Sequence, residues 1–349
     1  MTTTVGRLVT RLGRDGHATV HSAGELSVTK WRGADAGDAV VWSTATVPAD
    51  NSDAELDTAG KDIGTTINGG TVFRVTELGT GFRSPMHRTL SCDYLIVRTG
   101  ELQIIFESGE TLDLRPGDTV IQRGTAHAWR NPSQQERCTF AVAMIEANPV
   151  HVGSRTFGAT PTWRMLASAL RTVLPRGLGG PPVAGGTADS LRRAPRRIVT
   201  GHDPRGKAVV RSAGPIPAGV TNAGVTTSTI WTTPAVPIDN SGDEPEVAAS
   251  RTGTFGGSDF RILELAPGVT TPPDQSSSVD YCLVLSGAVE LILDSATTPP
   301  LGQGETVVQR GTTHSWLNPD PVTPSRIMIC RVEAKPVPAA LGAPIRPHR

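Results

Sequence analysis

The stretch from Met86 to Phe106, "MHRTLSCDYLIVRTGELQIIF", combines side chains that can bind a metal with the pattern of a β-strand. A histidine (His87), a hydroxyl two residues later (Thr89) and an acid six residues after the histidine (Asp93) lead into alternating apolar residues and a glycine turn. Side chains two residues apart on a strand share one face, so these groups can meet around one ion. The stretch is therefore either a metal site at the mouth of a β-barrel or the remnant of one.

The stretch has a second copy later in the chain. "QRGTAHAWRNP" at 122–132 returns as "QRGTTHSWLNP" at 309–319, an offset of 187 residues. The same offset carries Asp93-Tyr94 onto Asp280-Tyr281 without insertion or deletion. Upstream, "VTRLGRDGHATVHSAG" at 9–24 matches "VTGHDPRGKAVVRSAG" at 199–214, an offset of 190. A period this long is not that of a solenoid, so the sequence predicts two complete domains of like fold.

Composition restricts the class of protein. The 349 residues suffice for two domains with a full core each, and 33 basic residues balance 33 acidic ones. This balance argues against a nucleic-acid or anionic-membrane partner, because phosphate binding needs a basic face. The N-terminus has no apolar signal region, and no apolar run approaches a membrane span. Four cysteines without CxxC spacing favour free thiols, and we expect a cytoplasmic protein.

Each copy is expected to form an antiparallel sandwich or barrel, because short apolar runs alternate with Gly, Pro and Asn turns. The one predicted helix is "PTWRMLASALRTVL" at 161–174, which Pro175 ends before a Pro- and Gly-rich linker. The expected organisation is an N-terminal domain at 1–150, a helical linker at 151–195, a C-terminal domain at 196–336 and a tail at 337–349.

With these motifs the chain resembles a bicupin, that is, two tandem cupin (jelly-roll) barrels. The cupin motifs are G(x)5HxH(x)3-4E(x)6G and G(x)5PxG(x)2H(x)3N. The residues that match the two motifs in the N-terminal copy are Gly81, His87, Gly100, Gly117, Gly124, His127 and Asn131. Thr89 stands in place of the second histidine, Asp93 in place of the glutamate and Gln122 in place of the proline. The variant "MHRTxSxDY…QRGTxHxWxN" is most similar to small cupins of bacterial and fungal small-molecule metabolism.

The resemblance implies that His87, Asp93 and His127 hold one divalent metal. Two imidazoles and one carboxylate with open positions are the ligand set of non-haem Fe(II) oxygenases, so Fe(II) is favoured, while Zn, Mn or Ni would also fit. The alternative is an inert barrel in which these side chains are buried without a metal and hydrogen-bond to Thr89 and Ser91. In the C-terminal copy Asp274, Asp280 and His314 take the equivalent places and form a weaker candidate site, because only one imidazole is left.

Pocket residues follow from strand alternation. Trp129 lies two residues after His127 and is expected to point inward, either against a planar substrate or as core packing. Leu95, Thr89 and Gln122 complete the predicted pocket. Arg123 and Arg310 fit either a substrate carboxylate or a strand-end salt bridge. Tyr94 and Tyr281 are the only tyrosines and alternate with the acids, so we expect them in sheet or domain packing.

The prediction is a metal-dependent cupin enzyme that acts on a small, aromatic or polyketide-like organic molecule, with oxygenase-type oxidation favoured. Two alternatives stay open. One is metal-assisted cyclisation, dehydration or decarboxylation without redox change, and the other is a metal-free bicupin that binds a small molecule. A homodimer is compatible with either.

Overall fold

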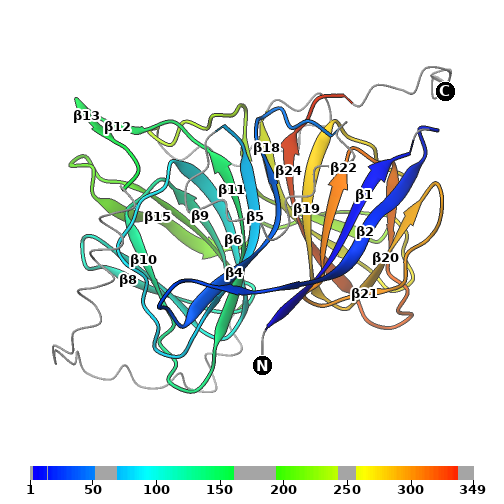
Figure 1. Cartoon of the computed structure of the whole chain (residues 1–349), viewed down its shortest axis with the longest axis horizontal. Coiled ribbons are helices and arrows are strands. Elements are labelled where there is room, and N and C mark those ends of the chain that lie inside the picture. The colour runs from blue at the N-terminus through cyan, green and yellow to red at the C-terminus, as the bar shows by residue number, and fades with distance from the viewer. Residues whose placement is uncertain (1–2, 14, 52–68, 161–193, 243–256, 337–349) are drawn as a thin grey trace.

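The chain is all-β in the computed structural model, which describes residues 3–13, 15–51, 69–160, 194–242 and 257–336. Two barrels lie side by side, and each consists of a large sheet and a facing small sheet (Figure 1). The predicted all-β fold is confirmed. The predicted helix at 161–174 and the tail at 337–349 lie outside the described residues. Of the linker predicted at 151–195, residues 151–160 and 194–195 are described, and the first of these stretches contains strands rather than a helix. Within the described ranges, no helix is long and apolar enough to cross a membrane.

The first barrel combines an eight-stranded and a three-stranded sheet. The large sheet contains, in spatial order, β15 (Ala208–Pro215), β14 (Arg196–His202), β9 (Thr119–Arg123), β6 (Ser91–Thr99), β11 (Cys138–Glu146), β5 (Thr71–Leu78), β4 (Ala36–Thr44) and β3 (Thr29–Lys30). The small sheet contains β10 (His127–Arg130), β7 (Leu102–Phe106) and β8 (Thr111–Leu114). A separate ribbon is formed by β12 (Val150–Val152) and β13 (Arg155–Phe157).

The second barrel has the same strand pairing. Its large sheet contains β16 (Val220–Asn222), β17 (Val225–Thr233), β18 (Ser258–Leu265), β24 (Ser325–Glu333), β19 (Ser278–Ser286), β22 (Thr306–Arg310), β1 (Thr4–Leu12) and β2 (Ala18–Ser27). Its small sheet contains β21 (Leu301–Gly302), β20 (Ala288–Leu293) and β23 (His314–Leu317). The central order β4-β5-β11-β6-β9 of the first barrel is matched by β17-β18-β24-β19-β22 of the second.

The two barrels exchange their first hairpins. The hairpin β1–β2, from the start of the chain, pairs with β22 of the second barrel, where Leu8 lies opposite Val307. The hairpin β14–β15 pairs in the same way with β9 of the first barrel, where Ile198 lies opposite Val120. The domain ranges predicted from the sequence, 1–150 and 196–336, therefore differ from the sheets at their N-terminal ends, because the first hairpin of each range pairs with the other barrel.

Alternation along the central strands separates two cores. On β6, Tyr94 and Ile96 point toward the other large sheet, whereas Leu95 and Val97 point into the first barrel. On β19, Tyr281 points toward the first barrel's large sheet and Val284 into its own barrel. Because side chains alternate with a period of two, Asp93 and Asp280 must face their barrel interiors.

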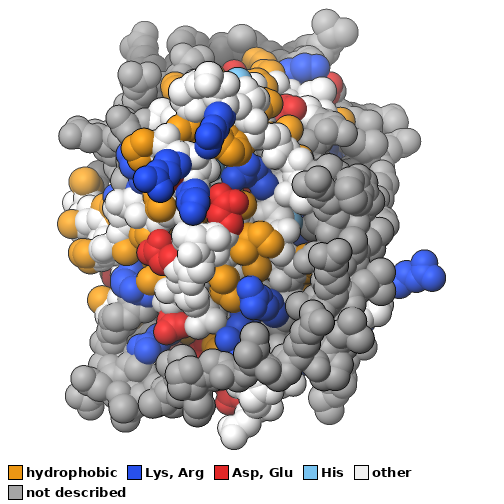
Figure 2. All heavy atoms as spheres, turned by 90° about the vertical axis from the view of Figure 1, so that its left-hand side faces the viewer, with side chains coloured by type: hydrophobic (Ala, Val, Ile, Leu, Met, Phe, Trp, Pro, Cys, Tyr) orange, Lys and Arg blue, Asp and Glu red, His pale blue; other side chains and the backbone are white. Residues whose placement is uncertain are grey.

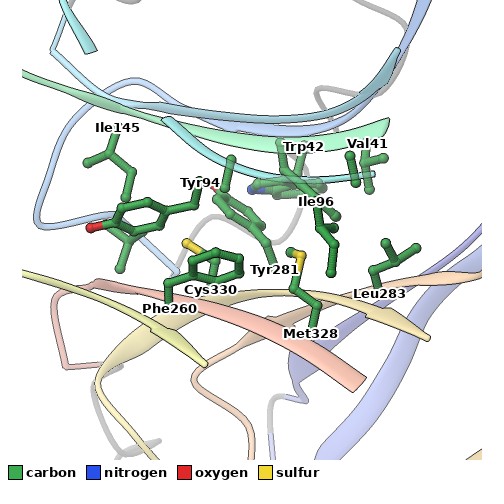
Figure 3. Packing of buried hydrophobic residues seen from close by; sticks show 14 of the residues in the cluster. Val41, Trp42, Tyr94, Ile96, Ile145, Phe260, Tyr281, Leu283, Met328 and Cys330 are labelled. Atoms are coloured by element: carbon green, nitrogen blue, oxygen red, sulfur yellow. The ribbon is translucent and has the colours of Figure 1, made fainter. Parts of the chain in front are cut away.

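The core between the large sheets contains two reciprocal aromatic stacks, and Figure 3 labels Tyr94, Phe260 and Tyr281 among the residues of this core. The Phe73 and Tyr281 rings are 5.2 Å apart at 15°, and the Tyr94 and Phe260 rings are 5.2 Å apart at 3°. The buried hydroxyl of Tyr94 lies 2.6 Å from Ser258 Oγ, and that of Tyr281 lies 2.5 Å from Thr71 Oγ1. The tyrosines therefore serve domain packing, as the alternation predicted.

Two arginines join the barrels at equivalent positions. The guanidinium of Arg123 on β9 lies 5.8 Å from the Trp231 ring and donates a hydrogen bond to the Gly242 carbonyl at 2.8 Å. Arg310 on β22 lies 5.2 Å from the Trp42 ring and donates to the Asn51 carbonyl at 3.2 Å. Each arginine thus reaches from its own sheet to the opposite large sheet or the loop that follows it.

The outer end of the first barrel has a mixed surface. Figure 2 shows basic, acidic and apolar side chains interspersed on the side that faces the viewer.

The aromatic stacks predict a large and symmetric cost of truncation. Phe260→Ala and Phe73→Ala should each lower the free energy of unfolding by about 3–5 kcal/mol, because each leaves a cavity between the sheets. Urea denaturation measures the loss, and Val220→Ala, at a residue 77% exposed, is the control that should change it by less than about 0.5 kcal/mol. A loss below about 1 kcal/mol from either phenylalanine would show that the sheets do not depend on this contact.

Candidate active site

His87 and His127 form the centre of the candidate site. His127 begins β10, and His87 lies directly opposite it in an isolated antiparallel bridge. The amide nitrogen of His87 donates to the His127 carbonyl at 2.8 Å, and that of His127 donates back at 2.9 Å. The two rings are consequently held with their centroids 4.4 Å apart. The structure thus brings together the two predicted imidazole ligands, 40 residues apart in the chain.

Backbone carbonyls fix the same tautomer in both rings. Nδ1–H of His87 donates to the Pro85 carbonyl at 2.9 Å, and Nδ1–H of His127 donates to the Thr125 carbonyl at 2.9 Å. Burial lowers the pKa of both imidazoles, that of His127 well below 6.5, so both rings are neutral at pH 7. Neither Nε2 has a recorded hydrogen-bond partner among the described residues. Two lone pairs are therefore available to a proton or a metal ion.

Asp93 is a buried acid without a cation of its own. It lies opposite Gln122 on β9 and Met144 on β11. Its Oδ1 has no hydrogen-bond partner among the described residues. Burial raises the pKa of Asp93 to about 7, against smaller lowering effects of Ser91 and Arg74. An orphaned carboxyl oxygen inside a barrel is the kind of group that a bound cation would satisfy.

Two predicted pocket residues are engaged with the protein itself. The side-chain amide of Gln122 lies 2.7 Å from Nδ1 of His127 and 2.5 Å from Oγ1 of Thr125. Thr89 accepts a hydrogen bond from the hydroxyl of Ser91 at 2.8 Å. The Gln122 atom in these contacts is Nε2, which donates to Thr125, so the Thr125 carbonyl and not Gln122 accepts the Nδ1 proton of His127. Thr89 belongs to the strand end beside His87.

The other two predicted pocket residues, Trp129 and Leu95, lie in the apolar interior of the first barrel. Trp129 contacts His127 edge-on at 5.0 Å and Phe140 at 5.5 Å. Phe140 was missed by the sequence analysis, although its position on the inward side of β11 follows from the same alternation. Aromatic and aliphatic walls thus surround the histidine pair.

The donor set fits a metal only in part. Nε2 of His87 and of His127 are suitable donors, and Asp93 is an acid that lacks a cation. Among the described residues, however, no group of three or more His, Cys, Asp or Glu side chains is arranged to hold a metal ion. A metal would therefore be held first by the two imidazoles, and Asp93 would have to turn toward it to serve as a third ligand.

The equivalent residues of the second barrel are arranged differently. Asp274 and His314 form the same antiparallel bridge as the histidine pair. Arg331 on β24, which the sequence analysis did not single out, contacts Asp274 and donates from Nε to Asp280 at 3.1 Å. Burial would raise the pKa of Asp274, but Arg331, with smaller contributions from His314 and Arg261, outweighs burial and lowers that pKa. Because both carboxylates already bind a cation from the protein, Asp274, Asp280 and His314 do not fit a metal here.

A cavity of about 480 Å³ lies away from both histidine positions, between the ends of β6 and β19. The lining includes Val97, Arg98, Ile262, Leu283 and Leu285. None of the predicted site residues lines it, so it is distinct from the candidate site.

Comparison with known proteins gives partial similarities to cupins. No family model matches the chain. It is 35% identical over 120 residues to a cupin-domain-containing oxidoreductase of Aspergillus ruber, covering 33% of this chain and 59% of that one. It is 38% identical over 95 residues to phomopsin biosynthesis cluster protein C' of Diaporthe leptostromiformis, covering 27% and 50%. The chain spans about half the length of the curated relatives it matches.

Solved structures show a weaker likeness. A salicylate 1,2-dioxygenase from Pseudaminobacter salicylatoxidans is 13% identical with a TM-score of 0.43, covering 75% of this chain and 70% of that one. An oxalate decarboxylase from Lactobacillus farciminis is 12% identical with a TM-score of 0.41, covering 76% and 77%. Likeness at this level says nothing about substrate or metal. The sequence relatives and the all-β barrels together support the cupin superfamily.

The raised pKa of Asp93 predicts a specific pH dependence of stability. The pKa of Asp93 is about 7 in the native state and near 3.8 in the unfolded chain. Between pH 3.8 and pH 7, Asp93 is therefore protonated in the native protein but ionised in the unfolded chain. This contribution to stability is fully present below pH 3.8 and is lost as the pH rises through 7. Asp93→Asn removes that loss and should gain up to about 4 kcal/mol relative to the wild type between pH 4 and pH 8.

Urea denaturation of the metal-free protein and of Asp93→Asn at several pH values measures the difference. The comparison cancels His87 and His127, whose lowered pKa values act in the opposite direction in both proteins. A difference that stays constant with pH would show that Asp93 ionises normally.

Proposed function

We propose that the chain is a cupin-type enzyme that oxidises a small, largely apolar organic molecule in the first barrel, with one divalent metal held by His87 and His127. Asp93 is the proposed third ligand, and Fe(II) is the favoured ion. The observation that carries the proposal is the histidine pair itself. Its two neutral imidazole rings have their centroids 4.4 Å apart, and the Nε2 atom of each ring is free to bind a metal. The orphaned Oδ1 of Asp93 supports the need for a cation nearby.

The protein's own residues would orient the substrate and control protons. Fe(II) supplies redox chemistry with oxygen when bound, whereas Zn, Mn or Ni in its place supplies Lewis acidity. Trp129 and Phe140 provide aromatic surfaces beside His127, on which a planar apolar molecule would pack. Asp93 would carry a proton near neutral pH while the barrel is metal-free, because its pKa is then about 7, and would release that proton when it binds the metal.

The names of the relatives favour oxidation as the reaction and biosynthesis of small natural products as the setting. Several are called cupin-domain-containing oxidoreductases, and others belong to the biosynthesis clusters of phomopsin and oryzines. Because the chain spans about half of those relatives, the activity and the substrate class are both proposals.

A second candidate is a metal-independent lyase or cyclase. It is favoured by the absence, among the described residues, of three converging ligands. Neutral imidazoles and a carboxyl group with a pKa of about 7 form an acid–base set that needs no metal. Activity that survives removal of every metal by a chelator would favour this candidate. If the protein contains no metal and turns over no substrate, the remaining interpretation is a protein that only binds a small molecule.

The metal proposal predicts unequal effects of two matched substitutions. His127→Ala should reduce the metal content and the oxidation of substrate to background, because one of two imidazole ligands is lost. His314→Ala should leave both nearly unchanged and should lower stability by about 1–3 kcal/mol through lost packing and hydrogen bonding. Elemental analysis of protein purified without chelator or added metal measures the content. Equal metal loss from the two variants would contradict the assignment to the first barrel.

A further inference from the structure

A partly buried arginine lies between the two acids of the second barrel's equivalent site. Nε of Arg331 donates to Oδ2 of Asp280 at 3.1 Å, and its Nη2 contacts Oδ2 of Asp274. The Asp280 side chain is only 3% exposed, and that of Arg331 is 15% exposed. Asp280 and Asp274 raise the pKa of Arg331 although burial would lower it, so the guanidinium stays charged. The second barrel thus contains a cation that belongs to the chain.

The strand register makes Arg331 the counterpart of Met144. Arg331 lies opposite Asp280 in the pairing of β24 with β19, and Met144 lies opposite Asp93 in the pairing of β11 with β6. The two positions are also 187 residues apart, the offset that relates the acids themselves. Met144 is buried at 7% exposure and has no charge, so Asp93 lacks the partner that Asp280 has.

The charges around these positions make a metal and the arginine mutually exclusive. A divalent ion bound by Asp274 and Asp280 would lie against the guanidinium that already contacts both carboxylates, and the two positive charges would repel each other. The further charged groups near Arg331 are Asp259, which adds to its attraction, and Arg261, which pairs with Asp259. Removing one partner of such a buried pair leaves an uncompensated charge, which is strongly unfavourable.

We propose that the guanidinium of Arg331 takes the place of a metal ion in the second barrel, and that the residue at this one strand position decides which barrel binds a metal. Methionine at 144 leaves the first barrel open to a cation, whereas arginine at 331 closes the second. The statement about the first barrel rests on the function proposed above, but the statement about the second barrel does not.

The second barrel is tested in a His127→Ala background, in which the first barrel has lost a ligand. Adding Arg331→Met frees Asp274, Asp280 and His314, and Co²⁺ binding should rise from background to about one ion per chain. Arg331→Lys keeps the positive charge and is the matched control, in which Co²⁺ should stay at background. A further His314→Ala should remove the Co²⁺ that Arg331→Met gained. Equilibrium dialysis with elemental analysis and the visible Co²⁺ spectrum are the readouts.

Folding is followed by circular dichroism, because Arg331→Met leaves two carboxylates without a cation. If this variant folds only when Co²⁺ is present, or melts at a higher temperature with it, the ion has replaced the guanidinium and the proposal holds. A folded variant that binds no Co²⁺ overturns the proposal. So does a variant that fails to fold with and without Co²⁺ while Arg331→Lys folds.

The first barrel is tested by the reverse exchange. Met144→Arg should place a guanidinium opposite Asp93, as Arg331 lies opposite Asp280, so Co²⁺ binding to the otherwise unmodified chain should fall to background. Met144→Leu, which adds no charge, should keep the Co²⁺. Unchanged Co²⁺ binding in Met144→Arg overturns the exchange of roles, whereas an unmodified chain that binds no Co²⁺ contradicts the function proposed above and leaves the test of the second barrel intact.

Discussion

The contact between the two eight-stranded sheets governs the rest of the structure. Each sheet uses one face for the shared core, where the Phe73–Tyr281 and Tyr94–Phe260 stacks lie. Because strand side chains alternate, the residues next to those aromatics in the sequence must point to the opposite face of the sheet, into a barrel. Asp93 beside Tyr94 and Asp280 beside Tyr281 are thus placed inside by the same packing that joins the barrels. A shift of one residue in either strand would exchange the acids with the tyrosines.

The exchanged hairpins and the arginine contacts strengthen this interface from its edges. β1–β2 completes the sheet of the second barrel and β14–β15 that of the first, so the second large sheet is assembled from two parts of the chain with the first barrel between them. Asn240 donates to the Ser91 carbonyl at 3.1 Å, and Asn51 donates to the Ser278 carbonyl at 2.8 Å. Each asparagine therefore ties one barrel to the strand that carries the other barrel's inward acid.

Much of this arrangement follows from sequence periodicity, and the remainder depends on long-range geometry. Alternation predicted the all-β fold, the inward Trp129 and the packing role of Tyr94 and Tyr281. Nothing local in the repeated "DNS" of 50–52 and 239–241 shows that its asparagine reaches across to the other barrel. The hairpin exchange was missed for the same reason, since a repeat gives the order of strands in each copy but not which copy a hairpin joins. Arg331 could have been found, because the offset of 187 aligns it with Met144.

The two barrels share one fold but compensate the charge of their buried carboxylates in different ways. A carboxylate inside a barrel needs either a proton, a cation from the protein or a cation from outside. Asp280 has a cation from the protein, the guanidinium of Arg331. Asp93 holds a proton in the metal-free protein, because burial raises its pKa to about 7. The neutral imidazoles nearby add no positive charge that would lower this pKa. A proton held at that pKa is easily exchanged near neutral pH, for a metal ion or with a substrate. In the first barrel Arg74 pairs with Asp38 and no ion pair with Asp93 is found among the described residues, so Asp93 is the inward acid that is available to a cation or a substrate from outside.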